Sequence, residues 1–189
     1  MMDETKRQAF GRIDQIREQI RAGVGRIDTL ALLNAARIAE ESAYGLTGPL
    51  RILFVCGGNT CRSPMAVGLA KDLFGDAVLC ESAGIYPGVQ TTPEAIEVML
   101  TAYGIDISHH RPRSVTHAPL DTYDLIVAMD SYVDSDLKTR FQVPIERLVS
   151  WDVDDPFLDP AGAEAYRKCA SVLQENLVNL FDRLAEIRT

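Results

Sequence analysis

An alternation of short apolar runs with helical segments, between residues 50 and 189, constrains the fold of this 189-residue chain more than any other feature. Four strand-like runs are predicted, at Ile52 to Val55, Val78 to Ser82, Leu125 to Ala128 and Arg147 to Ser150. They are separated by helical patterns that begin near Pro64, Thr92 and Tyr132, and a long final helix is expected from about Gly162 to Ile187. Strands interleaved with helices indicate parallel pairing, because each crossover passes through a helix. We therefore predict an α/β fold, a doubly wound four-stranded parallel sheet with helices on both faces.

Residues 1 to 49 follow a different pattern, that of a helical extension. Apolar side chains recur at helical spacing at Phe10, Ile13, Ile16, Ile20, Val24 and Ile27. A second helical stretch, Leu30 to Tyr44, ends at the breaker cluster Gly45 to Pro49, which is typical of a linker. We predict an extension and linker at 1–49 and a catalytic domain at 50–189. Because an isoleucine stripe needs burial, we expect 1–49 to cover the domain, a partner or a second copy of the chain.

Composition and charge limit the kinds of binding partner and the cellular compartment that we expect for this chain. A formal net charge of -8 and a pI near 4.9 disfavour a nucleic-acid surface. No run of about twenty apolar residues and no apolar signal core is present, so we expect a cytoplasmic protein without a membrane segment. The four cysteines and three histidines match no zinc spacing, so no metal or organic cofactor is predicted. Cys80 and Cys169 are interpreted as free thiols in the core.

The first strand-like run leads into the segment with the clearest chemistry. It ends at Cys56, a glycine pair follows at Gly57 and Gly58, and Arg62-Ser63 precedes the helix that Pro64 opens. A strand, a tight loop and a helix N-terminus gather a thiol, backbone N–H groups and a guanidinium around one small volume, which favours an anion. The loop is predicted to hold a phosphate against a sulfur nucleophile.

Each loop residue has a predicted task. The helix terminus and nearby donors favour the thiolate of Cys56, and glycine lets the backbone approach the anion. Arg62 offers a planar bidentate clamp, Ser63 a hydroxyl for the thiolate, and Asn59 tolerates a left-handed conformation. A nucleotide-binding P-loop is excluded, because its second glycine and its lysine are absent. A general acid is sought in the acidic segment 151–160, where the residues alone do not choose among four aspartates.

The segment from Cys56 to Ala66, together with Asp155-Pro156-Phe157, closely resembles the low-molecular-weight protein-tyrosine phosphatases. The resemblance spans about residues 50 to 189 and leaves 1–49 without a counterpart. It implies that Cys56 is the nucleophile, Arg62 the phosphate clamp and Asp155 the acid and base, with Asn59 and Ser63 as loop braces. Asp159 is the weaker acid candidate. Ser82 to Gly84 and Ala128 to Asp130 are expected to frame the loop, and the substrate is expected to be a phosphorylated protein or peptide.

Thr60 bears on which phosphate is cleaved. With Phe157-Leu158 it resembles the bacterial protein-arginine phosphatases, so phosphoarginine is favoured and phosphotyrosine stays the alternative. A larger aliphatic residue at 60 would crowd a branched guanidinium. Arsenate reduction, which in this family uses extra cysteines near the strand that ends at Ala128-Met129, is disfavoured, because Asp130 follows Met129 and no cysteine lies between Asp130 and Cys169. A non-catalytic phosphoprotein-binding module would lack the nucleophile or the acid, and both are present.

Cys61 has two interpretations. It is either a structural filler or a thiol that traps oxidised Cys56 as a reversible disulfide.

Overall fold

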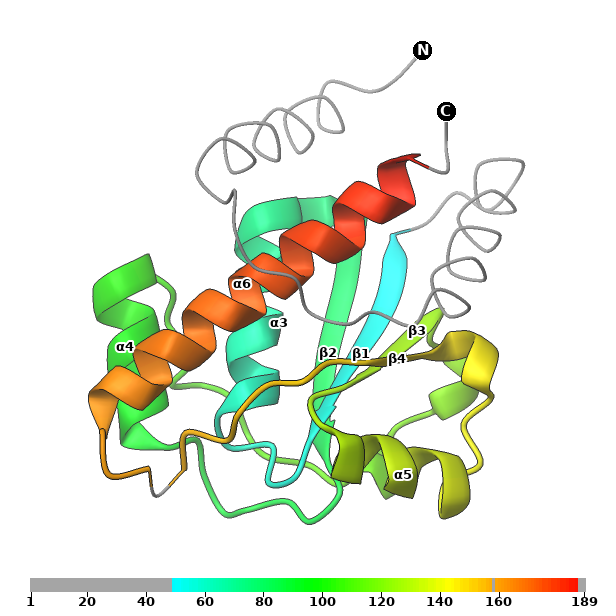
Figure 1. Cartoon of the computed structure of the whole chain (residues 1–189), viewed down its shortest axis with the longest axis horizontal. Coiled ribbons are helices and arrows are strands. Elements are labelled where there is room, and N and C mark those ends of the chain that lie inside the picture. The colour runs from blue at the N-terminus through cyan, green and yellow to red at the C-terminus, as the bar shows by residue number, and fades with distance from the viewer. Residues whose placement is uncertain (1–48, 158, 187–189) are drawn as a thin grey trace.

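The computed structural model describes residues 49–157 and 159–186, and its centre is a parallel sheet (Figure 1). The strands are β1 (Leu50–Cys56), β2 (Val78–Gly84), β3 (Leu125–Ala128) and β4 (Leu148–Ser150). Their order is β2-β1-β3-β4, and every pair is parallel. The predicted four-stranded parallel sheet is therefore confirmed. The predicted extension at 1–49 lies outside the described residues except for Pro49.

Helices cover both faces of the sheet, as predicted. They are α3 (Arg62–Phe74), α4 (Pro93–Tyr103), α5 (Ser131–Thr139) and α6 (Ala163–Glu186). Helices α3, α4 and α6 share one apolar cluster, whereas α5 contributes to the other, and Figure 1 shows α5 apart from the first group. Helix α3 begins at Arg62, two residues before the predicted start. Pro64 is tolerated there because N–H groups of the first helical turn have no partner within the helix.

The central strand explains how an unbroken apolar run can be buried. Ile52 and Phe54 of β1 belong to the cluster with α3 and α6, and Leu53 and Val55 belong to the cluster with α5. Both faces of a doubly covered strand are apolar, which is why the run does not alternate with polar residues. Trp151 packs at the end of β4, with its ring centroid 5.7 Å from that of Phe54.

The topology decides where a site can form. From β1 the chain leaves toward α3 on one face, and from the neighbouring β3 it leaves toward α5 on the other. Such a switch point opens a crevice at the carboxyl ends of the strands. The loop after Cys56 lies at this edge. Within the part of the chain that the structure describes, no helix is long and apolar enough to span a bilayer.

Candidate active site

The loop between β1 and α3 is held from outside by its carbonyl groups. Five consecutive carbonyls accept hydrogen bonds from surrounding segments: Cys56 O from Ile85 N (3.1 Å), Gly57 O from Tyr86 N (2.9 Å), Gly58 O from Gly88 N (2.8 Å), Asn59 O from His110 Nε2 (3.0 Å) and Thr60 O from Thr92 N (2.9 Å). In a trans peptide the N–H points opposite to the C=O. The loop N–H groups are therefore left for the inner side, where they form a cradle for an anion.

Two glycines of the surrounding segment let it approach this closely. A Cβ on Gly84 would lie 2.9 Å from the backbone nitrogen of Asn59, and one on Gly88 would lie 2.6 Å from Cγ2 of Thr60. Side chains at these positions would push the segment away from the loop. Thr60 is thus packed against Gly88, and the loop cannot widen there without moving both.

The sulfur of Cys56 lies at the bottom of the cradle, and the residue is 1% exposed. It accepts the backbone N–H of Asn59 at 3.1 Å and lies 3.1 Å from Oγ of Ser63. Asn59 has a φ of +53°, the left-handed conformation predicted for it, which turns its N–H toward the sulfur. Its side-chain Nδ2 donates to Oγ of Ser63 and Oγ of Ser82. Two donors therefore converge on the sulfur, which favours a thiolate.

Arg62 is 3% exposed as a residue, and its guanidinium links three elements of the site. Nη1 contacts Oδ2 of Asp130 at 2.6 Å and the carbonyl of Val153 at 3.1 Å, and Nη2 contacts Oδ2 of Asp155 at 2.5 Å. Burial works to lower the pKa of Arg62, but Cys56, Asp155 and Asp130 outweigh it and raise that pKa. The clamp stays positively charged at every relevant pH.

Asp130 has a larger part than the framing role expected from the sequence. Its Oδ2 holds Arg62, and its Oδ1 caps α5 by accepting the N–H of Val133 at 2.8 Å. The signal was present, since an aspartate that follows a strand and precedes a helix is a typical N-cap. The contact with Arg62, 68 residues away, depends on the fold.

Asp155 is the aspartate of the acidic segment that reaches the loop. Besides its contact with Arg62, its Oδ1 accepts the N–H of Phe157 at 3.1 Å and lies 3.6 Å from Sγ of Cys61. Asp154 instead pairs with Lys168, and Asp159 caps the N–H of Ala161. Geometry therefore separates Asp155 from its neighbours, which the composition of the segment did not. Leu158, which entered the substrate argument, lies outside the described residues.

The other three cysteines have a different environment from Cys56. Burial raises the pKa of Cys61, and the nearby groups Cys56 and Asp155 raise it further. Burial also raises the pKa of Cys80 and that of Cys169 to about 12. A thiol with a raised pKa stays protonated, and so unreactive, as the pH rises through neutrality. The interpretation of Cys80 and Cys169 as buried core residues is confirmed. The resolving role of Cys61 stays a prediction.

This difference predicts selective alkylation. At about pH 7, iodoacetamide should modify Cys56 and leave the other three cysteines in the folded chain unmodified, because only the thiolate attacks. Peptide mapping by mass spectrometry measures the labelled positions. The Cys56→Ser variant should take up no label until denaturant is added. Equal labelling of Cys61 and Cys56 in the folded protein would contradict the expectation.

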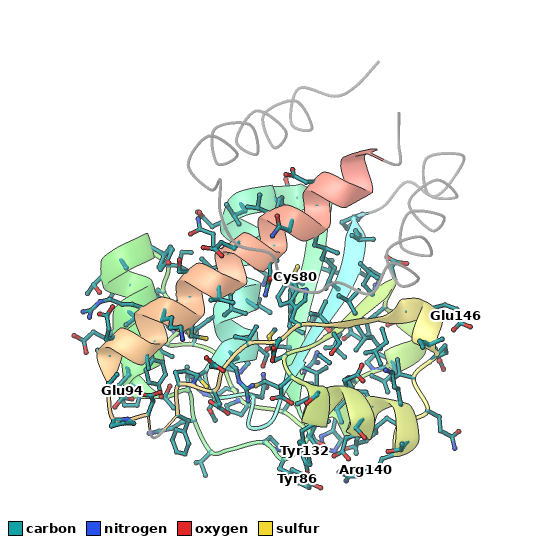
Figure 2. The ribbon with its side chains drawn as sticks, in the orientation of Figure 1. Cys80, Tyr86, Glu94, Tyr132, Arg140 and Glu146 are labelled. Carbon is teal, nitrogen blue, oxygen red and sulfur yellow. The ribbon has the colours of Figure 1, made fainter. Side chains whose placement is uncertain are left out.

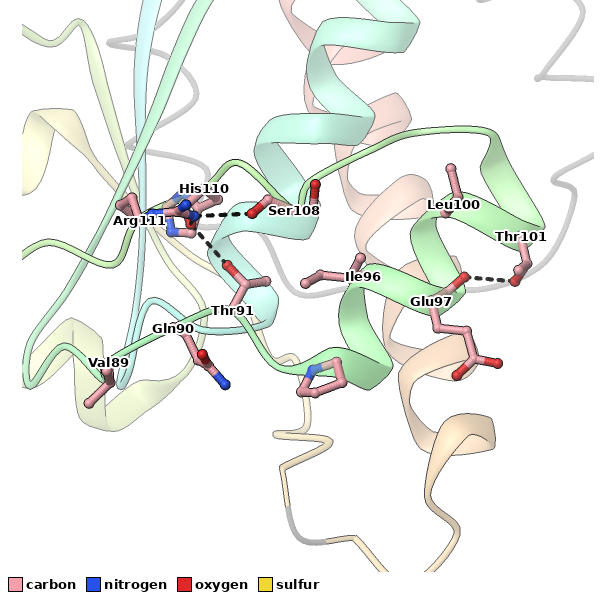
Figure 3. A pocket seen from close by; sticks show the side chains of 11 residues that line it. Val89, Gln90, Thr91, Ile96, Glu97, Leu100, Thr101, Ser108, His110 and Arg111 are labelled. Atoms are coloured by element: carbon pink, nitrogen blue, oxygen red, sulfur yellow. Dashed lines mark hydrogen bonds between the residues drawn. The ribbon is translucent and has the colours of Figure 1, made fainter.

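A pocket lies on the outer side of the loop, away from the sulfur. It has a volume of about 730 Å³ and is lined by the segment before α4, by α4 and by the turn after it, and Figure 3 shows Thr91 hydrogen-bonded to the turn that carries His110 and Arg111. None of Cys56, Arg62 and Asp155 lines it. His110 belongs to the turn after α4, and its ring donates a hydrogen bond to the carbonyl of Asn59.

An aromatic cluster lies beside the loop on another side. Tyr86 and Tyr132 are each 58% exposed. Arg140 Nη1 donates to the hydroxyl of Tyr86 at 2.6 Å, and Figure 2 shows all three side chains at the same edge of the molecule. Tyr86 is tied to the loop by its own N–H. Among the residues that the structure describes, no group of three or more His, Cys, Asp or Glu side chains is placed to hold a metal ion.

Comparison with known proteins agrees with this geometry. A family model described as "Low molecular weight phosphotyrosine protein phosphatase" matches residues 51–189. A solved low molecular weight protein tyrosine phosphatase from T. tengcongensis is 36% identical, with a TM-score of 0.61 over 72% of this chain and 98% of that one.

Three curated relatives carry different names. A probable low molecular weight protein-tyrosine-phosphatase, EpsP of Ralstonia nicotianae, is 35% identical over 113 residues, 56% of this chain and 77% of the relative. Arsenate reductase 2 of Staphylococcus epidermidis is 40% identical over 106 residues, with the same two shares. A protein-arginine-phosphatase of Geobacillus stearothermophilus is 34% identical over 149 residues, 73% of this chain and 95% of the relative.

Proposed function

Because the chain belongs to the low molecular weight phosphotyrosine protein phosphatase family, we propose that Cys56 is the nucleophile of a protein phosphatase in which Arg62 holds the phosphoryl group and Asp155 transfers protons. The observation that carries this proposal is the convergence of the Asn59 N–H and Ser63 Oγ on the sulfur, with the buried guanidinium over the same loop. Gly57, Gly58, Asn59, Thr60 and Cys61 supply the N–H cradle.

The reaction proceeds in two displacements. The thiolate of Cys56 attacks phosphorus, the bond to the leaving group breaks, and Asp155 gives its proton to the leaving atom. Asp155, now a carboxylate, then takes a proton from a water that attacks phosphorus. The P–S bond breaks, the sulfur leaves as thiolate stabilised by the Ser63 hydroxyl, and inorganic phosphate is released. The cradle N–H groups and Arg62 bind the equatorial oxygens throughout.

In this mechanism Nη2 of Arg62 binds Asp155 first and the phosphoryl group of the substrate afterwards. Asp130 and the carbonyl of Val153 fix Nη1, whereas Nη2 lies on Asp155. A phosphate dianion competes for Nη2 with greater charge and bidentate geometry. Its binding frees the carboxyl group of Asp155 to face the leaving group, while Asp130 keeps the clamp oriented.

Hydrolysis of p-nitrophenyl phosphate by the full chain tests the activity. Release of nitrophenolate supports the enzyme, and its absence together with measurable phosphate binding would favour a non-catalytic binding module.

Phosphoarginine is the proposed substrate group. The relative named protein-arginine-phosphatase is matched over 95% of its length. The Thr60 side chain packs against Gly88 beside the cradle, and a small hydroxyl-bearing residue in the loop leaves more room for a branched guanidinium than a larger aliphatic one would. The exposed tyrosines beside the loop offer a surface for a protein or peptide chain.

Phosphotyrosine is the second candidate, and the relative EpsP supports it. Arsenate reduction has less support in spite of the reductase relatives. After β3, where that branch of the family carries extra cysteines, this chain has Met129 and then Asp130, whose carboxylate is bound to Arg62.

Substitution of Thr60 tests the substrate preference. Thr60→Ile should lower the ratio of phosphoarginine to phosphotyrosine turnover, measured as kcat/KM, by about tenfold, the lower end of what one added methylene costs in a fitted pocket. Thr60→Val keeps the size of the side chain but removes the hydroxyl. If its ratio resembles that of Thr60→Ile, the hydroxyl sets the preference. If its ratio resembles that of wild type, the size of the side chain sets it. An unchanged ratio in both variants would rule out Thr60 as the determinant.

A further inference from the structure

Behind the loop, Arg113 joins the edge strand β2 to Asn59 through both its backbone and its side chain. We propose that Arg113 is a positioning residue: it sets the direction of a hydrogen-bond chain that runs through Asn59 and Ser63 and ends on Cys56. The proposal rests on the proposed function, in which Cys56 is the nucleophile.

The chain starts at a donor whose direction is fixed. The backbone N–H of Arg113 donates to Oδ1 of Asn59 at 2.9 Å. A backbone N–H cannot accept, so the carboxamide of Asn59 must present its oxygen to Arg113 and its nitrogen to the other side. Asn59 is fully buried, so no water can replace this partner without cost.

The orientation of Asn59 then decides the direction of Ser63. Both protons of Nδ2 are used, one on Oγ of Ser63 at 2.8 Å and one on Oγ of Ser82 at 2.9 Å. Since Ser63 accepts from Asn59, its own proton is free to point at Sγ of Cys56, 3.1 Å away. With the carboxamide reversed, the oxygen of Asn59 would draw the Ser63 proton away from the sulfur.

The side chain of Arg113 holds its backbone in place. Nε donates to the carbonyl of Ser82 at 2.9 Å, and Nη2 contacts Oε2 of Glu81 at 2.8 Å and the hydroxyl of Tyr123 at 3.3 Å. Tyr123 in turn donates to Glu81. The hydrogen bond from Tyr123, followed by that from Arg113, lowers the pKa of Glu81, so the carboxylate is charged at neutral pH.

The backbone carbonyl of Arg113 is held by β2 as well. The carbonyl of Arg113 accepts the N–H of Gly84 at 2.9 Å. Four contacts of Arg113 with β2 and Tyr123 thus fix the position of the backbone N–H that binds Asn59. None of these contacts involves the reacting atoms. Removal of the guanidinium releases three of them.

The test is Arg113→Ala, with Arg147→Ala as matched control. Arg147 is also half-buried and its guanidinium also makes three contacts, but with the carbonyls of Leu120 and Tyr123 and the carboxylate of Asp121, none of which belongs to the loop. We expect Arg113→Ala to slow iodoacetamide alkylation of Cys56 at about pH 6, and to lower kcat, by about tenfold each, the effect of losing one hydrogen bond to a charged group. Arg147→Ala should change neither. The inhibition constant of inorganic phosphate, which reports the cradle, should stay near that of wild type in both.

A second substitution separates this role from general loosening of the fold. In a Ser63→Ala background the hydrogen-bond chain is already cut, so Arg113→Ala should slow alkylation by less than about twofold further. Arg113→Lys should recover part of the loss, because an ammonium can still reach Glu81. Equal effects of Arg113→Ala in the two backgrounds, or an unchanged alkylation rate, would overturn the proposal. Alkylation needs no substrate, so a chain without phosphatase activity would refute the proposed function and leave this test intact.

Discussion

Cys56→Ser is expected to lower kcat for p-nitrophenyl phosphate by about 10⁵-fold or more, the scale seen when a nucleophile that acts with partners is removed. A serine hydroxyl fits the same place in the cradle, but it lacks a base to take its proton. The thiolate needs none, because the Asn59 N–H and the Ser63 hydroxyl already favour the charged form. Steady-state hydrolysis measures the loss.

The same variant should keep the anion site. The cradle N–H groups and Arg62 are unchanged, so inorganic phosphate should bind with an affinity similar to that of wild type in isothermal titration. Acid-quenched wild type, mixed with labelled substrate, should carry phosphate on Cys56, and the variant should carry none there. Cys80→Ser is the control. Cys80 lies in β2, at the end of the sheet away from Tyr86 and so away from the loop (Figure 2), and the Cys80→Ser variant should therefore retain the kcat of wild type. Substantial turnover by Cys56→Ser would remove Cys56 from the mechanism.

Structural features that depend on a few neighbouring residues could be predicted from the sequence. The run from Ile52 to Val55 reads as a strand covered on both faces, and the following glycines and Pro64 mark a loop and a helix start. The left-handed φ of Asn59 was also expected, because asparagine is one of few residues that adopt it at small cost. Such signals act over a few residues, so they survive without knowledge of the fold.

Contacts between distant segments were not predictable in this way. From the sequence, only the family resemblance identified Asp155 as the general acid. The physical reason is its contact with Arg62, and this contact exists only because the segment after β4 meets the loop after β1 in the fold. Neither His110 nor Arg113 was singled out from the sequence, yet one binds the carbonyl of Asn59 and the other its side-chain carbonyl. No local sequence pattern marks either residue, because their contacts with Asn59 span more than 50 residues of the chain.

Asp155→Asn is expected to lower kcat by about 10²- to 10⁴-fold, the usual contribution of a positioned general acid and base. Asparagine keeps the size and the contact with Arg62 but cannot give a proton to the leaving group or take one from water. The loss should be larger for phenyl phosphate than for p-nitrophenyl phosphate, because nitrophenolate leaves without protonation. Comparison of kcat for the two substrates in wild type and variant measures this difference.

Asp159→Asn provides the matched control for that experiment. Asp159 also precedes a proline in the same acidic segment, but its carboxylate caps the N–H of Ala161 and the residue is exposed. Its substitution should leave kcat for both substrates near wild type. If Asp159→Asn instead shows the dependence on the leaving group and Asp155→Asn does not, the acid is Asp159. The contact of Asp155 with Arg62 would then serve only to hold the clamp before phosphate binds, and Asp155→Asn, which keeps that contact, should leave kcat for both substrates near wild type.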